Sequence, residues 1–460
     1  IRGEHRGKVT HSTAGARVLD YLQEELNQQY KLDEGLLKEG IKEKNWPLVK
    51  SLYKELLQYP ILAHHGLYDI INWDFKYQTK LRFDREECKK GELKDCEKEF
   101  LKLLNEDFEK QYKATIVDTY YQGFLEFINL YNKMTKMAQK MEKFEDKDNK
   151  VNSRLKARSF YFGVTVRLLL SILKEGDIYD SANYAKFGKD YLYNQNELNE
   201  IWKSLEEKIE VLYKGFEEKA DRSELDLVRS DMADNLHQLS LEHKNGNYKL
   251  DMPVGAGKTF AALRYAVSGA RAFEKKRIYY CTAYLSILEQ NAKEIKGVLG
   301  EEYLLEHHSN VAENNEVIAS LEKKEKEEDE SKKDKDEYKN IEYLKESWES
   351  PVVLTTLVQM FNTLFKGRAS NIRRFSKLIN STIIIDEVQS LPLKTTYIAN
   401  LMMNYLAEVL NCTIVHSTAT QPYLDNQILF YPCFYNHEEQ ETMVELVEDA
   451  QVFHRVNYYH

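Results

Sequence analysis

Two short stretches decide the fold of this chain: Met252-Pro253-Val254-Gly255-Ala256-Gly257-Lys258-Thr259, and Asp386-Glu387-Val388-Gln389. The first follows a short apolar run, and the second closes the run Ile383-Ile384-Ile385. A glycine loop at the start of a helix offers backbone N–H groups to phosphate oxygens, and Lys258 adds a positive charge near the β and γ phosphates. Asp386 is suited to hold Mg²⁺ together with the Thr259 hydroxyl, and Glu387 to orient an attacking water. The two stretches together predict a site for ATP and Mg²⁺.

The glycine loop departs from the strict P-loop pattern at its first position, where this chain has Met252 in place of glycine. A chance glycine turn before a core helix is the alternative interpretation, and the acidic stretch after a second apolar run argues against it. We therefore predict Lys258, Asp386 and Glu387 as the catalytic residues. The predicted nucleotide-binding residues are Pro253, Gly255, Ala256, Gly257, Lys258, Thr259, Asp386, Glu387 and Gln389.

Composition indicates two or three mostly helical domains, because the 460 residues include 42% hydrophobic residues but only 7 prolines and 19 glycines. The formal net charge of -10 weakly disfavours a uniformly basic nucleic-acid binder, although local grooves can still be basic. The five cysteines contain no Cys-x-x-Cys pair, and this odd number is typical of a reducing cytosol. No apolar run approaches 18 uncharged residues, so we expect a cytoplasmic protein without a membrane partner.

The pattern of apolar residues changes near residue 223. Before it, apolar residues recur at three- and four-residue spacing, for example over residues 14–26, 48–57 and 124–137, and this spacing predicts helices. After it, short β-rich runs alternate with helical ones, at residues 248–251, 277–281, 352–355, 382–385 and 413–416. Nearly continuous apolar strands separated by helices indicate a parallel sheet covered on both faces. The expected fold is an all-α domain followed by an α/β domain.

Further polar stretches lie at the ends of predicted strands. Thr282 opens a stretch that runs to Gln290, Thr355-Thr356 ends another strand, and Ser417-Thr418-Ala419-Thr420 closes a further one. Hydroxyl and amide groups at strand ends can bond phosphates without reading bases. Each stretch alone is also ordinary turn chemistry. Their common order, however, resembles that of superfamily 2 helicases and predicts a RecA-like helicase lobe. The predicted nucleic-acid contacts are Thr282, Gln290, Thr355, Thr356, Ser417 and Thr418.

Histidines in the helical part form the second informative feature. His64-His65-Gly66 follows a predicted helix, His11 precedes another, and Asp177 follows an apolar segment. Adjacent side chains on a helix point about 100° apart, so two histidines at a helix end reach two neighbouring ions more easily than one. Imidazole and carboxylate ligands suit Mn, Fe, Co, Ni or Zn, and a two-metal site can cleave a phosphodiester. A surface or capping role for the His-His pair stays open on the residues alone.

The order His-Ser, His-His-Gly, Ser-x5-Asp, Pro-x-Gly-x-Gly-Lys-Thr, Asp-Glu-Val-Gln and Ser-Thr-Ala-Thr-Gln-Pro resembles the HD-nuclease/helicase of type I CRISPR interference. The resemblance implies an all-α HD-type metal nuclease domain followed by a RecA-like helicase lobe. It implies recruitment by an RNA-guided surveillance complex, cleavage of the displaced single-stranded DNA, and ATP-driven translocation in the 3′ to 5′ direction in a prokaryote. In the family's pattern two divalent metals such as Mn, Fe, Co or Ni are bound by His11, His64, His65 and Asp177.

The chain departs from that family in lacking a His-Asp doublet and a second motor lobe. Val254 replaces the usual Thr of the phosphate loop, and Ala283 stands where the family often has Pro. We expect truncation at both ends, so that this chain alone binds ATP weakly and turns it over poorly. The expected domains are a helical nuclease domain (1–222), a first helicase lobe (223–422) with a charged insertion near 311–350, and a linker toward the absent lobe (423–460). A non-nucleolytic motor with a helical docking domain and a nucleotide-gated scaffold are the alternatives.

Overall fold

A computed structural model describes residues 15–16, 18–24, 45–63, 107–141, 153–184, 193–308, 347–425 and 431–436. The chain divides into two compact units, Ile1–Phe187 and Gly188–His460. None of the described helices carries an uncharged apolar stretch that could span a lipid bilayer.

The described part of the first unit is helical. Its long helices are α3 (Trp46–Ala63), α6 (Asp107–Gln139) and α7 (Ser153–Tyr184), and residues 18–24 are also helical. Their core is rich in aromatic side chains, among them Trp46, Tyr53, Tyr120, Phe124 and Phe127. The apolar spacing that predicts helices over residues 48–57 and 124–137 is thus explained by a shared buried face of α3 and α6.

Gly123 lets α3 approach α6 closely. The Tyr53 hydroxyl donates a hydrogen bond to the Tyr120 carbonyl oxygen at 3.0 Å, and its ring stacks at a tilt on the rings of Tyr120 and Phe124. A Cβ atom on Gly123 would stand 2.5 Å from that hydroxyl oxygen, which is closer than atoms can pack. Glycine at this position therefore serves helix packing.

The second unit contains a six-stranded sheet in which all neighbouring strands are parallel. The strands lie in the order β1-β6-β5-β2-β4-β3. Their bounds are Gly246–Asp251 (β1), Arg277–Thr282 (β2), Leu304–His307 (β3), Val352–Thr356 (β4), Ser381–Asp386 (β5) and Thr413–Thr418 (β6). Because β6 lies between β1 and β5, it separates the two strands that the phosphate loop and the acidic stretch follow.

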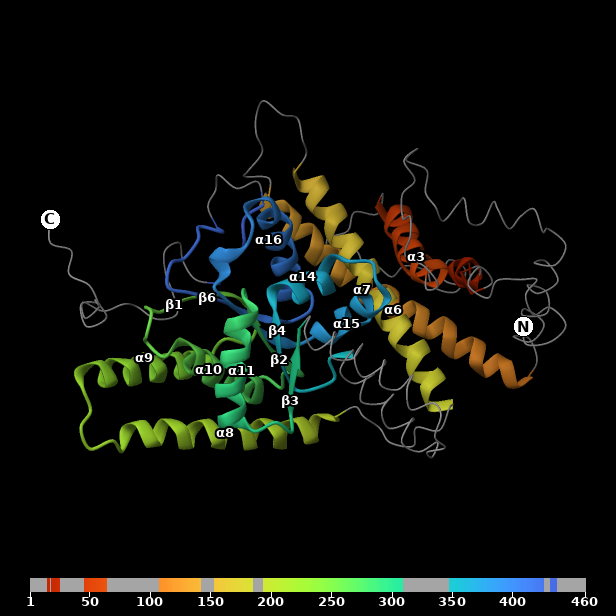
Figure 1. The fold of residues 1–460 in the computed structure, drawn as a ribbon. Helices are drawn as coiled ribbons and strands as arrows, with labels where there is room; N and C mark the ends of the chain where they lie inside the picture. The colour runs from red at the N-terminus through yellow and green to blue at the C-terminus, as the bar shows by residue number, and fades with distance from the viewer. Residues whose placement is uncertain are drawn as a thin grey trace, which may run out of the picture. The chain divides into compact units, whose positions relative to one another are not determined.

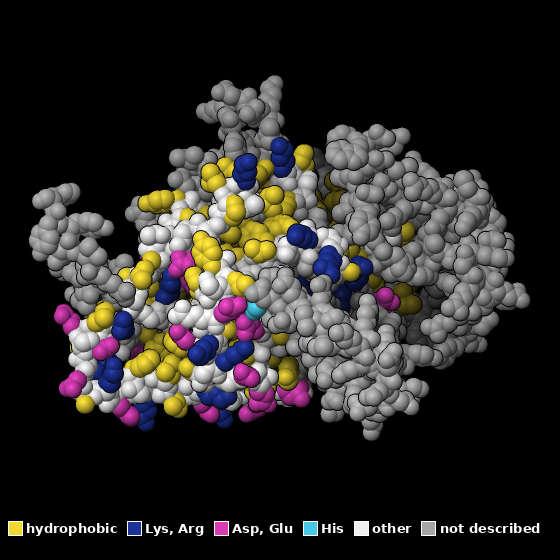
Figure 2. Space-filling model, in the orientation of Figure 1, with side chains coloured by type: hydrophobic (Ala, Val, Ile, Leu, Met, Phe, Trp, Pro, Cys, Tyr) yellow, Lys and Arg dark blue, Asp and Glu magenta, His cyan; other side chains and the backbone are white. Residues whose placement is uncertain are grey.

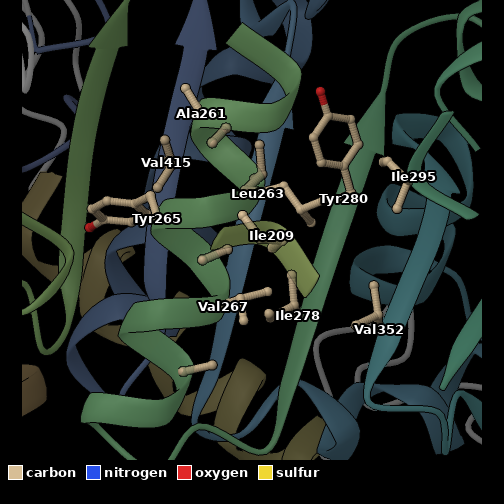
Figure 3. Close-up of a cluster of buried hydrophobic side chains, with 14 of the residues drawn as sticks. Ile209, Ala261, Leu263, Tyr265, Val267, Ile278, Tyr280, Ile295, Val352 and Val415 are labelled. Atoms are coloured by element: carbon tan, nitrogen blue, oxygen red, sulfur yellow. The ribbon is translucent and has the colours of Figure 1, made fainter. Parts of the chain in front are cut away.

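Helices cover both faces of this sheet (Figure 1). One face carries α10 (Lys258–Ala272) and α11 (Leu285–Leu299), with α8 (Gln195–Glu217) and α9 (Glu224–Ser240) packed on α10. The other face carries α14 (Leu357–Phe365) and α16 (Leu393–Glu408), and α15 (Ala369–Phe375) packs on α14. Buried side chains of α8, α10, β2 and β4, including Ile209, Val267, Ile278 and Val352, form one continuous core (Figure 3).

All five predicted strands are present, each extended by one or more residues. The strand β3 is not among the predicted ones. Residues 431–436, which the sequence places in a linker, pack on the α/β unit: the Asn404 side chain donates to the Pro432 carbonyl oxygen, and Tyr435 forms a parallel bridge with Asn247 of β1. On the face shown in Figure 2, cationic and anionic side chains of the described residues are intermixed. Charges of both signs therefore share that face.

Candidate nucleotide site

The phosphate loop connects the end of β1 to the start of α10. Gly255 and Gly257 have φ values of 89° and 80°, in the left-handed region that glycine enters without strain. A short turn closes inside the loop, because the Ala256 N–H donates to the Pro253 carbonyl oxygen at 3.1 Å. The helix α10 begins at Lys258, with Gly257 as its N-cap and no side chain bonded to its first N–H groups. These free N–H groups and the helix dipole form a site for phosphate oxygens.

Arg229 of α9 binds the backbone of the phosphate loop. Its Nε donates to the Gly255 carbonyl oxygen at 2.8 Å, and one terminal nitrogen lies 3.4 Å from an Asp226 carboxylate oxygen. Because that carbonyl is bonded to the arginine, the loop's backbone orientation is tied to α9. Sequence reasoning missed Arg229, since a single arginine on a polar helix face carries no motif.

The acidic stretch lies beside Lys258. Lys258 Nζ donates to Glu387 Oε1 at 3.0 Å and lies 3.6 Å from Asp386 Oδ1. The Asp386 side chain is only 6% exposed, whereas the Glu387 side chain is 31% exposed. Glu387 has φ 57°, a left-handed conformation that costs a non-glycine residue about 1 kcal/mol. The Glu387 N–H donates to the Ser417 carbonyl oxygen at 2.9 Å, so a hydrogen bond to β6 supports this turn.

The two carboxyl groups differ in electrostatic environment. Burial raises the pKa of Asp386 above its ordinary value, and the neighbouring Lys258 offsets this only in part. Burial alone would also raise the pKa of Glu387, but hydrogen bonds from Lys258 and Gln389 outweigh it, and the pKa lies below its ordinary value. The surroundings therefore favour the ionised form of Glu387 and disfavour that of Asp386. Oxygen donors on Thr259 and Asp386, close to a phosphate site, are the ligands that Mg²⁺ prefers, so the residues present fit this ion.

A chain of hydrogen bonds joins the end of β6 to the acidic stretch. The Thr418 hydroxyl donates to Gln389 Oε1 at 2.5 Å, and Gln389 Nε2 donates to Glu387. The Ser417 hydroxyl lies 3.4 Å from Asp386 Oδ1 and donates to it. The predicted nucleotide-binding residue Gln389 thus contacts the predicted catalytic residue Glu387, and two predicted nucleic-acid residues contact the same cluster.

The hydroxyl groups predicted to contact nucleic acid are all buried. They lie at the carboxyl ends of β2, β4 and β6, the sheet edge where ligands of parallel sheets bind. Thr282 donates to the Tyr284 carbonyl oxygen, Thr355 donates to that of His307, and Thr356 caps α14 by accepting from Gln359 N–H. Gln290 lies on the exposed side of α11, where it donates to Glu294. Nucleic-acid contact by these residues stays a prediction.

Exposed apolar side chains occupy the same edge. One follows each of the strands β1, β2, β4, β5 and β6, namely Val254, Tyr284, Val358, Leu393 and Tyr423, with exposed fractions from 60% to 77%. Because the carboxyl ends of parallel strands meet at one edge, these side chains line the rim around the phosphate loop. The rim therefore presents apolar groups, while the neighbouring hydroxyls bond within the lobe.

Of the predicted metal ligands, only Asp177 lies within the described residues. It is part of α7 and exposed, and α3 ends at Ala63, directly before His64. His11, His64 and His65 lie outside the described residues. Within the part of the chain that the structure describes, no three potential ligand side chains gather into a metal cluster. That finding does not test the three predicted histidine ligands, because they lie outside the described residues.

Sequence reasoning also missed Tyr280 of β2, which contacts the predicted catalytic residues. Its hydroxyl donates to Asp386 Oδ2 at 3.1 Å. Burial raises the pKa of Tyr280 well above its ordinary value, so the hydroxyl keeps its proton. A tyrosine in an apolar strand gives no functional signal, because only the neighbouring position of β5 makes it part of the site.

The α/β unit matches a known protein family. Residues 191–422, half of the chain, match the family model described as "Type III restriction enzyme, res subunit". That match begins just before α8 and ends after the Ser417-Thr418 stretch, so it includes every part of the nucleotide site.

The chain is also similar to the CRISPR-associated nuclease/helicase Cas3 of Haloferax volcanii, with 29% identity over 185 residues. This similarity covers 38% of this chain and 19% of that protein. Among solved structures, the T. fusca Cas3–ATP crystal structure matches 93% of this chain and 46% of that chain, with 12% identity and a TM-score of 0.43. The T. fusca Cas3–AMPPNP structure matches 91% and 44%, with 12% identity and a TM-score of 0.42.

The chain thus spans less than half the length of these relatives. The match over half of its residues and the nucleotide site within that match lead to one conclusion: the chain belongs to the type III restriction enzyme res subunit family, and its helicase region is Cas3-like.

Proposed function

We propose that this chain is the ATP-binding motor part of a Cas3-type nuclease–helicase that acts on DNA at the direction of an RNA-guided CRISPR complex. The observation that carries the proposal is the meeting of Lys258, Asp386 and Glu387 beside the phosphate loop. Membership of a helicase family and the similarity to Cas3 support it.

Each residue of the site has a distinct part in ATP hydrolysis. The loop N–H groups and Lys258 bind the phosphates, and Asp386 with Thr259 would hold Mg²⁺, which neutralises phosphate charge when bound. Lys258 now donates to Glu387 at 3.0 Å. Phosphates that attract Lys258 would release the Glu387 carboxylate, which then orients the attacking water. Gln389 keeps Glu387 in place from the other side.

The proposed substrate is single-stranded DNA, moved in the 3′ to 5′ direction. The carboxyl-end loops of β2 and β4 provide the proposed contacts, including Thr282, Thr355 and Thr356, which would reach the sugar-phosphate backbone after rearrangement. Thr418 connects this edge to Glu387 through Gln389. Such a connection supports coupling between DNA contact and ATP hydrolysis.

The helical unit is the proposed nuclease part, with His11, His64, His65 and Asp177 as ligands of two transition metals. Residues that flank two of these positions in the sequence lie together. Gln58 Nε2 donates to the Ala16 carbonyl oxygen at 3.0 Å, and a Cβ on Gly15 would stand 3.2 Å from Ile61. The chain shortly after His11 therefore touches α3 shortly before His64. The α7 helix, which carries Asp177, packs on α3 as well.

The motor half of the proposal is tested by nucleotide binding, because binding needs only this lobe. We expect a fluorescent ATP analogue to bind the full chain in the presence of Mg²⁺, and Lys258→Ala to weaken binding at least about tenfold through loss of a charge-assisted bond. Lys203→Ala on the exposed face of α8 serves as the matched control. Equal binding by the wild type and Lys258→Ala would contradict an ATP site at this loop.

The nuclease half is tested by incubating circular single-stranded DNA with the protein, Mn²⁺ or Ni²⁺, and no ATP. We expect cleavage that His64→Ala/His65→Ala abolishes. DNA left intact by protein with bound metal would favour the alternative of a motor with a helical docking domain. Partner binding that responds to ATP analogues, without any ATP hydrolysis by a complete chain, would favour the nucleotide-gated scaffold.

A further inference from the structure

Tyr280 is fully buried below the nucleotide site. It lies in β2, beside Ile384 of β5 in the register, and is 1% exposed. Its ring is part of the core beneath α10, and its hydroxyl points toward the end of that helix where Ala261 lies (Figure 3). The phosphate loop enters α10 at this same end, since the helix begins at Lys258.

The Tyr280 hydroxyl is bonded to the acidic stretch and lies close to the phosphate loop. It donates to Asp386 Oδ2 at 3.1 Å. A phenol has a single hydrogen to donate, so this bond uses it. The Thr259 side chain lies close enough to the phenol to offset part of the rise in its pKa. Tyr280 therefore holds the Asp386 carboxylate close to the Thr259 hydroxyl.

The bond from Tyr280 fixes the orientation of the Asp386 carboxylate. Asp386 uses Oδ2 for Tyr280, while its Oδ1 lies 3.6 Å from Lys258 Nζ and accepts from Ser417 at 3.4 Å. Hard cations bind the lone pairs of such carboxylate oxygens. One candidate Mg²⁺ ligand, Asp386, is thus oriented by Tyr280.

We infer that Tyr280 is a positioning residue that orients Asp386 for Mg²⁺, an inference that rests on the proposed ATP site. A purely structural role would be filled by any acceptor, as it is for the adjacent Tyr279. That residue is equally buried but points to the opposite face of the sheet, where its hydroxyl donates to the Lys377 carbonyl oxygen at 3.0 Å. Tyr279 therefore offers a matched control.

The experiment compares the wild type, Tyr280→Phe and Tyr279→Phe of the full chain. The affinity for a fluorescent ATP analogue is measured in EDTA and in a Mg²⁺ titration. Binding of Mn²⁺ in the presence of the analogue is followed by electron paramagnetic resonance. We expect Tyr280→Phe to need about tenfold more Mg²⁺ and to bind Mn²⁺ more weakly, because Asp386 loses a hydrogen bond that holds its carboxylate in place. In EDTA it should bind nucleotide like the wild type, which also shows that the loop is folded.

The possible results separate this inference from the function it rests on. If the wild type gains affinity from Mg²⁺ and Tyr280→Phe gains as much, Tyr280 does not position the ligands. If Tyr279→Phe loses the Mg²⁺ effect to the same degree, the hydroxyls act only through stability, and the inference is again wrong. If the wild type binds no nucleotide under any condition, the proposed ATP site fails and this inference fails with it.

Discussion

Lys258 stands between two carboxylates, and it favours Glu387 over Asp386 by distance, 3.0 Å against 3.6 Å. An ion pair in a half-buried site of this kind competes with any phosphate that needs the same ammonium group. These three residues can be predicted from the sequence, because glycine spacing and adjacent acidic residues after an apolar run are local motifs. Their partners Tyr280 and Arg229 cannot be predicted in this way, because only tertiary packing brings them to the site.

At the residue scale, Glu387→Gln should separate binding from hydrolysis. Removing the charge frees Lys258 for phosphate, so we expect ATP-analogue affinity to be kept or increased. Loss of the carboxylate that orients water should slow hydrolysis at least about a hundredfold. The measurement is DNA-stimulated phosphate release by a complete chain that hydrolyses ATP, beside Glu217→Gln on the exposed face of α8 as control. A variant that hydrolyses ATP at the wild-type rate would show that Glu387 is not the catalytic carboxylate.

At the scale of elements, apolar patterning predicted five strands correctly and their parallel arrangement with them. The sixth strand was missed for a physical reason. β3 has only two apolar residues before Glu306 and His307, and it is stabilised by β4, which follows only after residues 309–346. The order of the strands in the sheet cannot be predicted from local sequence patterns either, because it depends on which strands pair in the folded protein. The insertion of β6 between β1 and β5 explains how Ser417 reaches Asp386.

Two glycines in long helices test how the helical unit is packed. Gly163 in α7 has nothing within 4 Å of an added Cβ, so Gly163→Ala should stabilise by about 0.5–1 kcal/mol through helix propensity. Gly123→Ala in α6 gains the same helix propensity, but its Cβ would lie 2.5 Å from the Tyr53 hydroxyl oxygen. We therefore expect a net decrease of about 1–3 kcal/mol in the free energy of unfolding. Urea unfolding of the full chain measures both. Shifts of the same sign would show that α3 and α6 do not approach as described.

At the scale of the whole molecule, buried ionisable groups connect stability to pH. His416 of β6 is fully buried with its Nδ1 bonded to the Tyr435 hydroxyl, while its Nε2 has no partner among the described residues. Burial and, secondarily, Lys249 lower its pKa to about 3. Burial, Arg374 and His308 likewise lower the pKa of His307 to about 3. Both histidines are neutral in the folded protein.

The sign of the effect follows from proton counts. Between about pH 3 and the unfolded pKa of about 6.5, the unfolded chain binds more protons at these two positions than the folded chain. Stability is therefore present above about pH 6.5 and is lost as the pH falls, by about 1.4 kcal/mol per pH unit for each histidine. Protonation of His416 is opposed by Lys249, whose Nζ is paired with Asp425 at 2.6 Å.

We expect the urea midpoint of the α/β unit to fall steadily from pH 7 to pH 5.5, before ordinary carboxylates begin to titrate. His416→Asn keeps a polar partner for Tyr435 but cannot take up a proton in this range. Its midpoint should fall with about half the wild-type slope, because His307 alone still titrates. The quantity compared is the change in urea midpoint per pH unit, not the midpoint itself. A variant that is less stable at every pH therefore still tests the prediction. An unchanged slope would mean that His416 is already accessible to protons in the folded chain, and that residues 431–436 do not seal this face of the sheet.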